Sequence, residues 1–149
     1  MTKFIPKALH KYYTPGFDVA WLQNWDEKVN KIAEITLNQD VRLVAGVPSW
    51  MAILFDRILR LEKKNGGTRK TIGEIWQNLN CFIHGGMGYA PYRSLFSELV
   101  GKDIFYIDTY SATEGGQLAV QAFPDEPGMI PLFDLGVLFE FIPIDETDK

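Results

Sequence analysis

The sequence is poor in the residues that build disulfides and metal centres. Its 149 residues include one cysteine, Cys81, and two histidines, His10 and His84. One cysteine excludes an internal disulfide and a zinc site of the multi-cysteine kind. Two histidines are too few for a histidine-based metal site. Because a chain without disulfides fits a reducing compartment, we expect a cytoplasmic protein.

Long apolar runs and clustered basic residues are also scarce. No apolar stretch reaches the length of a membrane span, and the N-terminus lacks the apolar core of a signal peptide. The formal net charge is −4, and the one dense basic stretch, residues 63–70, is typical of a solvated helix end and turn. Because phosphate backbones require clustered Lys and Arg, we expect neither a nucleic-acid partner nor a membrane partner.

Three familiar site motifs are missing as well. The chain has no G-x-x-x-x-G-K-[ST], which excludes a P-loop enzyme, and no G-x-G-x-x-G, the dinucleotide fingerprint. It also lacks the G-x-S-x-G nucleophile elbow, which weighs against an α/β-hydrolase. Any site in this chain must therefore use a different arrangement of residues.

What the sequence does contain is an alternation of strand and helix patterns. Buried strands are predicted at residues 41–47, 80–84 and 104–110, and helices begin near Asn24, Pro48, Thr71 and Pro91. Further strands are predicted at residues 118–123 and 130–133, the latter paired with 137–142 across Asp134-Leu135-Gly136. This order predicts an α/β fold: a layered, mostly parallel sheet flanked by helices, with an antiparallel hairpin near the C-terminus.

Glycine residues follow the second predicted strand, in the run Phe82-Ile83-His84-Gly85-Gly86-Met87-Gly88. Ligands of α/β sheets bind beyond the carboxyl ends of strands, and glycine there lets a flat ligand approach the backbone. On spacing alone, glycines that simply turn the chain are the favoured alternative. We expect His84 to be a hydrogen-bonded residue at the strand end rather than a catalytic one, and Cys81 to be a buried apolar residue.

Polar residues follow the third predicted strand, in the run Thr109-Tyr110-Ser111-Ala112-Thr113-Glu114-Gly115-Gly116. Such a set can hold a nucleotide, with Tyr110 against the base, Thr113 on a phosphate oxygen and Glu114 on Mg²⁺. A polar turn with an exposed Glu114 remains the alternative interpretation.

Five motifs in register resemble the auxin-responsive Gretchen Hagen family of acyl acid–amido synthetases, within the adenylate-forming superfamily. They are A-G-V-P-S-W-M at 45–51, F-I-H-G-G at 82–86, P-Y-R at 91–93, T-Y-S-A-T-E-G at 109–115 and F-E-F-I-P at 139–143. The resemblance implies ATP and Mg²⁺ as cofactors, with Thr113 and Glu114 as catalytic residues and Glu114 as the metal ligand. It implies a nucleotide site at Gly85, Gly86, Met87, Tyr110, Ser111 and Thr113.

The resemblance also implies a two-step reaction. ATP and a carboxylic acid form an acyl-adenylate and pyrophosphate, and the amine of an amino acid then attacks to give an amide. The family builds part of its acyl pocket at the position of Val47, Trp50 and Met51, although an apolar stripe there is also typical of plain core. The identities of the acid and the amino acid are not readable.

Other segments of the family have no counterpart here: the Ser/Thr/Gly-rich phosphate loop, the Tyr-Arg-x-Gly-Asp segment and the domain with the adenylation lysine. We therefore expect residues 1–149 to form a single partial domain, an internal fragment of the large N-terminal domain of such an enzyme, inactive alone. Strands without neighbours predict self-association. The alternatives are a fragment of an acyl-CoA ligase, whose second nucleophile is a thiol, and a non-catalytic binding or interaction module.

Overall fold

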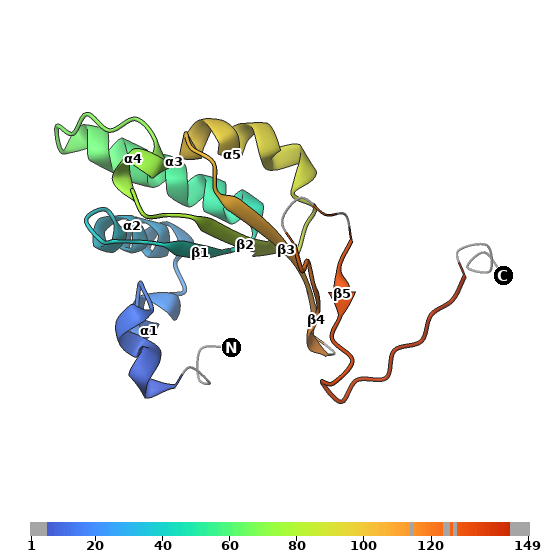
Figure 1. The fold of residues 1–149 in the computed structure, drawn as a ribbon. Helices are drawn as coiled ribbons and strands as arrows, with labels where there is room; N and C mark the ends of the chain where they lie inside the picture. Colours follow the sequence, from blue (N-terminus) through green and yellow to red (C-terminus); the bar gives the residue numbers. More distant parts are fainter. Residues whose placement is uncertain (1–5, 114, 124–125, 127, 144–149) are drawn as a thin grey trace.

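A computed structural model describes residues 6–113, 115–123, 126 and 128–143 of the chain (Figure 1). In order, its elements are η2 (Lys7–Tyr12), α1 (Phe17–Ala20), α2 (Trp25–Thr36), β1 (Leu43–Gly46), α3 (Pro48–Lys64), α4 (Ile72–Ile75), β2 (Cys81–Gly85), η3 (Ala90–Tyr92), α5 (Arg93–Val100), β3 (Phe105–Ala112), β4 (Gly116–Val120) and β5 (Ile130–Pro131). Within these residues, the helices are too short or too polar to cross a membrane.

The helices begin where capping residues allow them to. The side chain of Asn24 accepts a hydrogen bond from the Glu27 N–H at 2.9 Å, which caps α2. Thr71 and Glu74 form a complete capping box at the start of α4. Pro48 occupies the first turn of α3, where its missing N–H costs nothing. All three starts agree with the sequence patterns.

The strands form one five-stranded sheet in the order β1-β2-β3-β4-β5. The pairs β1–β2 and β2–β3 are parallel, whereas β3–β4 and β4–β5 are antiparallel. Because helices α3 and α5 connect the parallel strands, the predicted α/β fold with an antiparallel C-terminal portion is confirmed.

The predicted hairpin between residues 130–133 and 137–142 is wrong. Ile130 and Pro131 pair with Val120 and Ala119 of β4, and residues 137–142 belong to no strand. The alternation of apolar residues in 137–142 predicts a strand only where a free sheet edge is within reach. In this structure the segment runs away from the sheet (Figure 1), so it does not pair with β5, although β5 is the last strand of the sheet.

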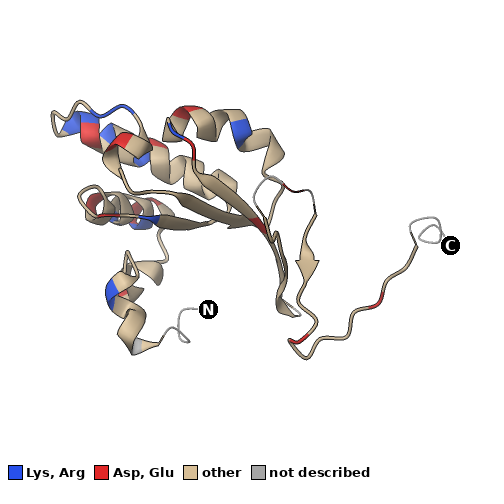
Figure 2. Ribbon diagram, viewed as in Figure 1, with Lys and Arg blue, Asp and Glu red and all other residues tan. Residues whose placement is uncertain are grey.

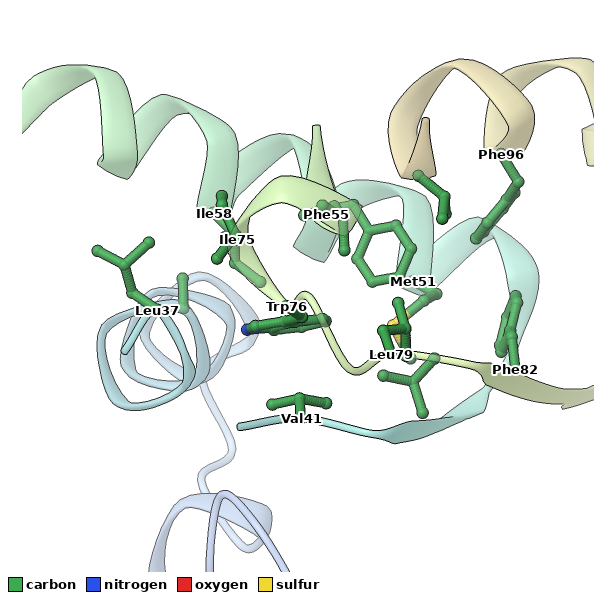
Figure 3. Packing of buried hydrophobic residues seen from close by; sticks show 14 of the residues in the cluster. Leu37, Val41, Met51, Phe55, Ile58, Ile75, Trp76, Leu79, Phe82 and Phe96 are labelled. Atoms are coloured by element: carbon green, nitrogen blue, oxygen red, sulfur yellow. The ribbon is translucent and has the colours of Figure 1, made fainter. Parts of the chain in front are cut away.

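The hydrophobic core lies between one face of the sheet and the helices. Phe55 and Ile58 of α3, Phe96 of α5 and Phe82 of β2 are all fully buried in this core (Figure 3). The indole N–H of Trp76 donates to the Thr36 carbonyl at 2.8 Å and thereby ties α2 to this core. Cys81, in contrast, is only half-buried. Because side chains alternate along a strand, Cys81 points to the face of the sheet opposite to Phe82, away from the core. The prediction that Cys81 is a buried apolar residue is therefore wrong.

A partly buried ion pair joins the end of α3 to the loop before α4. The Nε and Nη2 atoms of Arg69 donate to the two carboxylate oxygens of Glu62 at 2.7 and 2.6 Å. The Glu62 side chain is 5% exposed and that of Arg69 is 36% exposed. The hydrogen bonds from Arg69 lower the pKa of the Glu62 carboxyl, although burial opposes the shift. The pair therefore stabilises the fold while Glu62 is ionised.

We expect Arg69→Gln to lower the free energy of unfolding by about 2 kcal/mol at pH 7. It leaves the Glu62 carboxylate buried without its cation, and the partial exposure of Arg69 reduces the cost below that of a fully buried pair. The pKa of Glu62 is lower in the folded chain than its unfolded value of 4.5. The ion pair therefore contributes fully to stability above pH 4.5, and this contribution is lost as the pH falls through the folded pKa. Urea unfolding at several pH values measures both effects.

The matched control for this variant is Arg60→Gln. Arg60 lies 2.6 Å from Asp56, but both side chains are largely exposed. Its loss should cost less than about 0.5 kcal/mol at any pH. This account would be contradicted if both variants lost the same free energy of unfolding. It would also be contradicted if the difference in stability between wild type and Arg69→Gln did not become smaller toward low pH.

Close packing of β2 against β3 also requires glycine at the end of β2. A Cβ atom at Gly85 would lie 2.5 Å from the carbonyl oxygen of Thr109 and 2.6 Å from its Oγ1. The same hydroxyl donates to the His84 carbonyl at 2.8 Å, so it cannot turn away without losing that bond. The backbones of the two strands are thus fixed close together at this end.

Gly85→Ala should therefore lower the free energy of unfolding by about 1–3 kcal/mol, because overpacking forces the strands apart. Gly88→Ala is the matched control, since a Cβ atom there meets nothing within 4 Å and the backbone has no positive φ. Thermal unfolding of the two variants measures the difference. If both alanines are tolerated equally, β2 and β3 are not in this close contact.

Candidate functional site

The carboxyl ends of the three parallel strands meet at one edge of the sheet. Gly46 of β1 pairs with His84 of β2, and Gly85 of β2 pairs with Thr109 of β3. The segments that follow these strands therefore begin side by side. This edge is where α/β sheets bind their ligands, and it brings together three of the motifs that the sequence singled out.

The segment after β1 places a helix N-terminus at this edge. Val47 is the N-cap of α3 and offers no side-chain capping bond, and Pro48 follows it. The N–H groups of the first turn are thus without a side-chain acceptor from the N-cap, and the helix dipole adds partial positive charge there. The Cγ2 atom of Val47 lies 3.5 Å from the position that a Cβ of Gly86 would take. The first and second motifs are therefore neighbours.

The segment after β2 is an exposed glycine turn. Gly86 has φ +78° and is exposed, and Met87 and Gly88 are exposed beside it. The backbone of this turn is therefore open to a flat ligand. The positive φ gives Gly86 a second, conformational reason to be glycine, because a valine there would be strained whatever the site binds.

The segment after β3 holds the predicted nucleotide residues. Tyr110 is 55% exposed and follows Thr109, the partner of Gly85. The hydroxyl of Ser111 donates to Oε1 of Gln117 at 2.8 Å, so it is engaged within the β3–β4 hairpin. Thr113 is exposed in the turn, and Glu114 lies outside the described residues. The strand itself continues through Ala112, two residues beyond its predicted end, with a register shift between Tyr110 and Ser111.

The three acyl-pocket candidates have different surroundings. Val47 is half-buried at the strand ends, as described above. Trp50 is exposed, and its ring lies 5.3 Å from that of Trp25 at the start of α2. Met51 is buried in the core, and its Cε atom lies close to Gly46. Of the three, Val47 is the one that the structure brings to the glycine turn.

A buried histidine lies directly below this edge. His84 is 3% exposed, and its Nδ1 atom lies 3.3 Å from Oδ1 of Asp108, without a well-formed hydrogen bond in the described part of the chain. Burial lowers the pKa of His84 more than Asp108 raises it, so the imidazole is neutral. Tyr89 stacks on the imidazole at 4.5 Å, and burial raises the pKa of that tyrosine. We predicted a hydrogen bond for His84. At Nδ1 the structure shows instead only the nearby carboxylate of Asp108.

A cavity of about 870 Å³ opens beside this histidine. Its wall includes Arg93 from α5, Asp108 from β3, and Gln121 and Met129 from the loop between β4 and β5. Gln121 pairs with Asp108 in place of a strand residue. Its side-chain oxygen accepts from the Asp108 N–H at 3.0 Å, and its backbone N–H donates to the Asp108 carbonyl at 2.8 Å. Sequence reasoning missed this cavity because the loop returns to α5 from far along the chain.

Metal binding by the described residues alone is not supported. They contain no group of three or more His, Cys, Asp or Glu side chains that could hold a metal ion. Mg²⁺ accepts one or two protein carboxylates and completes its shell with phosphate oxygens and water. A single carboxylate at the end of β3 would fit that chemistry, provided that a nucleotide supplies the remaining ligands.

Comparison with solved structures finds apo MatB from Rhodopseudomonas palustris. Its crystal structure aligns with 80% of this chain at 17% sequence identity and a TM-score of 0.39, and the chain spans 18% of the length of that protein. This likeness is too low to carry an argument about function. No curated protein matches the chain.

Comparison with protein families gives a clear result. The model described as the GH3 family N-terminal domain matches residues 12–105, which is well over half of the 149 residues. The matched part includes β1, the start of α3, β2 and the glycine turn, and it ends at Phe105, before Tyr110. This chain therefore belongs to the GH3 family, and residues 12–105 are part of that family's N-terminal domain.

Proposed function

We propose that this chain is the nucleotide-facing part of an ATP-dependent acyl-adenylating ligase that conjugates a carboxylic acid to an amino acid. One observation carries the proposal. The register of the parallel strands gathers the start of α3, the glycine turn and the Tyr110 segment at a single carboxyl edge. Membership of the GH3 family supports the same reaction class.

Adenine would lie between the glycine turn and Tyr110. The exposed backbone at Gly86 offers a flat surface without side chains, and the half-exposed ring of Tyr110 can stack on a base. Neither residue contributes to the hydrophobic core, so both are available to a ligand. A purine is large and flat enough to contact both.

The phosphates and the acid would lie toward α3 and the hairpin turn. The hydroxyl of Thr113 would donate to the α-phosphate, and Glu114 would hold Mg²⁺ between itself and the phosphate oxygens. The partial positive charge at the start of α3 favours an anion beside Val47, and the acid's carboxylate is such an anion. Holding this carboxylate in line with the α-phosphate is what adenylate formation requires.

Removal of the Tyr110 ring should weaken ATP binding without affecting the fold. We expect Tyr110→Ala to raise the Kd for ATP roughly tenfold, since a base–aromatic stack contributes about 1–3 kcal/mol. Tyr110→Phe should retain most of the affinity because it keeps the ring. Phe123→Ala, which truncates another exposed aromatic, is the control. Amide shifts in ¹H–¹⁵N spectra during an ATP titration give the affinities. An unchanged Kd for Tyr110→Ala would remove adenine from this position.

Loss of the Glu114 charge should remove the effect of magnesium rather than the binding of the nucleotide. A bare carboxylate beside a triphosphate is repulsive, so the wild-type chain should bind MgATP better than ATP alone, roughly tenfold. Glu114→Gln should bind both forms equally. Glu98→Gln, an exposed charge on α5, is the control. Calorimetric titrations with and without Mg²⁺ measure the ratio of the two affinities. If this ratio is the same in Glu114→Gln as in the wild-type chain, Glu114 does not hold Mg²⁺ and belongs to a polar turn.

A further inference from the structure

The cavity beside His84 has no part in the nucleotide site proposed above, although it has the size of a ligand-binding pocket. Its volume of about 870 Å³ lies within the range of about 300–1,000 Å³ that is typical of small-molecule sites. Gly88, which belongs to the glycine turn, lies in its wall. The cavity therefore adjoins the edge at which we place ATP, and a molecule bound in it would lie beside the nucleotide.

Hydrogen bonds of Gln121 hold one wall of this cavity in place. Its backbone and its side chain both pair with the backbone of Asp108, at 2.8 and 3.0 Å. Its side-chain amide also donates to the Glu126 carbonyl at 2.7 Å. Gln121 thus ties the chain after β4 to β3 and fixes the backbone that carries the Asp108 carboxylate. A wall held in this way can receive a ligand at little cost in ordering.

Asp108 is an unusual residue for its position in the sheet. The three parallel strands, all of whose residues the structure describes, contain no other Asp, Glu, Lys or Arg (Figure 2). Parallel strands are normally apolar because elements pack on both of their faces. Burial of a charge costs free energy unless a partner compensates it. A carboxylate in such a strand, facing a cavity, therefore raises the question of its partner.

No cation of the described residues neutralises this carboxylate. Its one ion-pair contact there is with His84, whose Nδ1 lies 3.3 Å from Oδ1. Burial lowers the pKa of His84, so the imidazole is neutral, and Nδ1 makes no well-formed hydrogen bond. Oδ1 accepts from the Thr109 N–H at 2.9 Å, and no hydrogen bond within the described part of the chain occupies Oδ2. Asp108 can therefore accept hydrogen bonds from a cationic group in the cavity.

Arg93, at the start of α5, brings the opposite charge to the same cavity. Its side chain is exposed and, unlike Arg60 and Arg69, makes no ion pair with a carboxylate of the described residues. It lies near Tyr89, since its charge lowers the pKa of that tyrosine, although burial has the larger effect and raises it. Because Arg93 does not pair with Asp108 either, the cavity wall carries two opposite charges that leave each other unneutralised.

Two separate, opposite charges on one wall match a zwitterion. A guanidinium binds a carboxylate through two parallel hydrogen bonds, and a carboxylate accepts strong hydrogen bonds from an ammonium group. Apolar side chains also contribute to the wall, among them Ile104, Phe105 and Met129. They would contact an apolar side chain of the ligand. A nucleotide fits less well, because Asp108 would repel its phosphates.

We propose that this cavity binds a free α-amino acid with an apolar side chain, with Arg93 holding its carboxylate and Asp108 its ammonium group. The amino acid is then the acceptor substrate of the amide-forming step, and it enters beside the glycine turn, next to the acyl-adenylate. This role rests on the proposed function. The binding itself rests on the cavity and its two charges.

Methionine methyl groups report on the two sites separately. Met129 lies in the cavity wall, Met87 in the glycine turn and Met51 in the core. The full chain, labelled with ¹³C at its methionine methyl groups, is titrated with L-leucine and separately with ATP. We expect leucine to shift the Met129 signal until it saturates and to leave Met51 unchanged.

Two analogues of leucine test the recognition of a zwitterion. Isoamylamine lacks the carboxylate, and isocaproate lacks the ammonium group. Each should bind at least roughly tenfold more weakly than leucine, because each loses a hydrogen bond between charged groups. An analogue that binds as tightly as leucine would make the cavity a site for a single charge and would overturn the proposal.

Two substitutions test the assigned residues. Arg93→Gln and Asp108→Asn should each raise the Kd for leucine at least roughly tenfold. Asparagine keeps an oxygen for the Thr109 N–H and Arg93 is exposed, so both chains should fold, and an unchanged Met51 signal checks this. Asp103→Asn, which removes another carboxylate from the cavity wall, is the control and should bind leucine normally. Unchanged binding in either test variant, or equal weakening in all three, would overturn the assignment.

The outcomes separate this inference from the proposed function. If ATP shifts Met87 but leucine leaves Met129 unchanged at every concentration, the amino acid site is overturned and the nucleotide site stands. If leucine shifts Met129 but ATP leaves Met87 unchanged, the nucleotide site fails and the cavity is still an amino acid site. Displacement of leucine from Met129 by ATP would assign the cavity to the nucleotide and would overturn the inference.

Discussion

The parallel register of β1, β2 and β3 is the constraint on which the rest of this structure depends. It aligns Gly46 with His84 and Gly85 with Thr109, and the close approach at Gly85 leaves no room for a side chain there. The same register places Phe82 in the core and Phe105 on the opposite, exposed face of the sheet. A slip by one residue would exchange the two faces and separate the glycine turn from Tyr110.

Local signals predicted much of the fold. Asn24, Pro48 and the Thr71–Glu74 box start helices through hydrogen bonds and φ preferences that act within a few residues, so a single sequence carries them. The parallel strands were also predictable, since short apolar runs separated helices. Because parallel strands end at a common edge, the grouping of the glycine turn with the Tyr110 segment followed from that order, although no local signal fixed the distances between them.

Features that depend on distant partners were not predictable. Residues 137–142 have the alternation of a strand, but a strand also has to return to a sheet edge, and this segment leaves the sheet after β5 instead of pairing with it. The half-buried position of Cys81 depends on which face the helices cover, which a short apolar run cannot indicate. Asp108 approaches His84, and Gln121 closes the cavity beside them, only because β3 and the β4–β5 loop return to the same place. Glu114 lies outside the described residues, so the proposal that it holds Mg²⁺ is based on the chemistry of its carboxylate and not on its position.

The central claim is that adenine lies at the edge formed by the glycine turn and the Tyr110 segment. Intermolecular nuclear Overhauser effects between the adenine H2 and H8 protons of bound ATP and the protein test it most directly. The account predicts contacts from adenine to the Tyr110 ring and to the Gly86 Hα protons. Contacts instead to Arg93 and Met129, in the cavity beside His84, would place the nucleotide elsewhere and contradict the account.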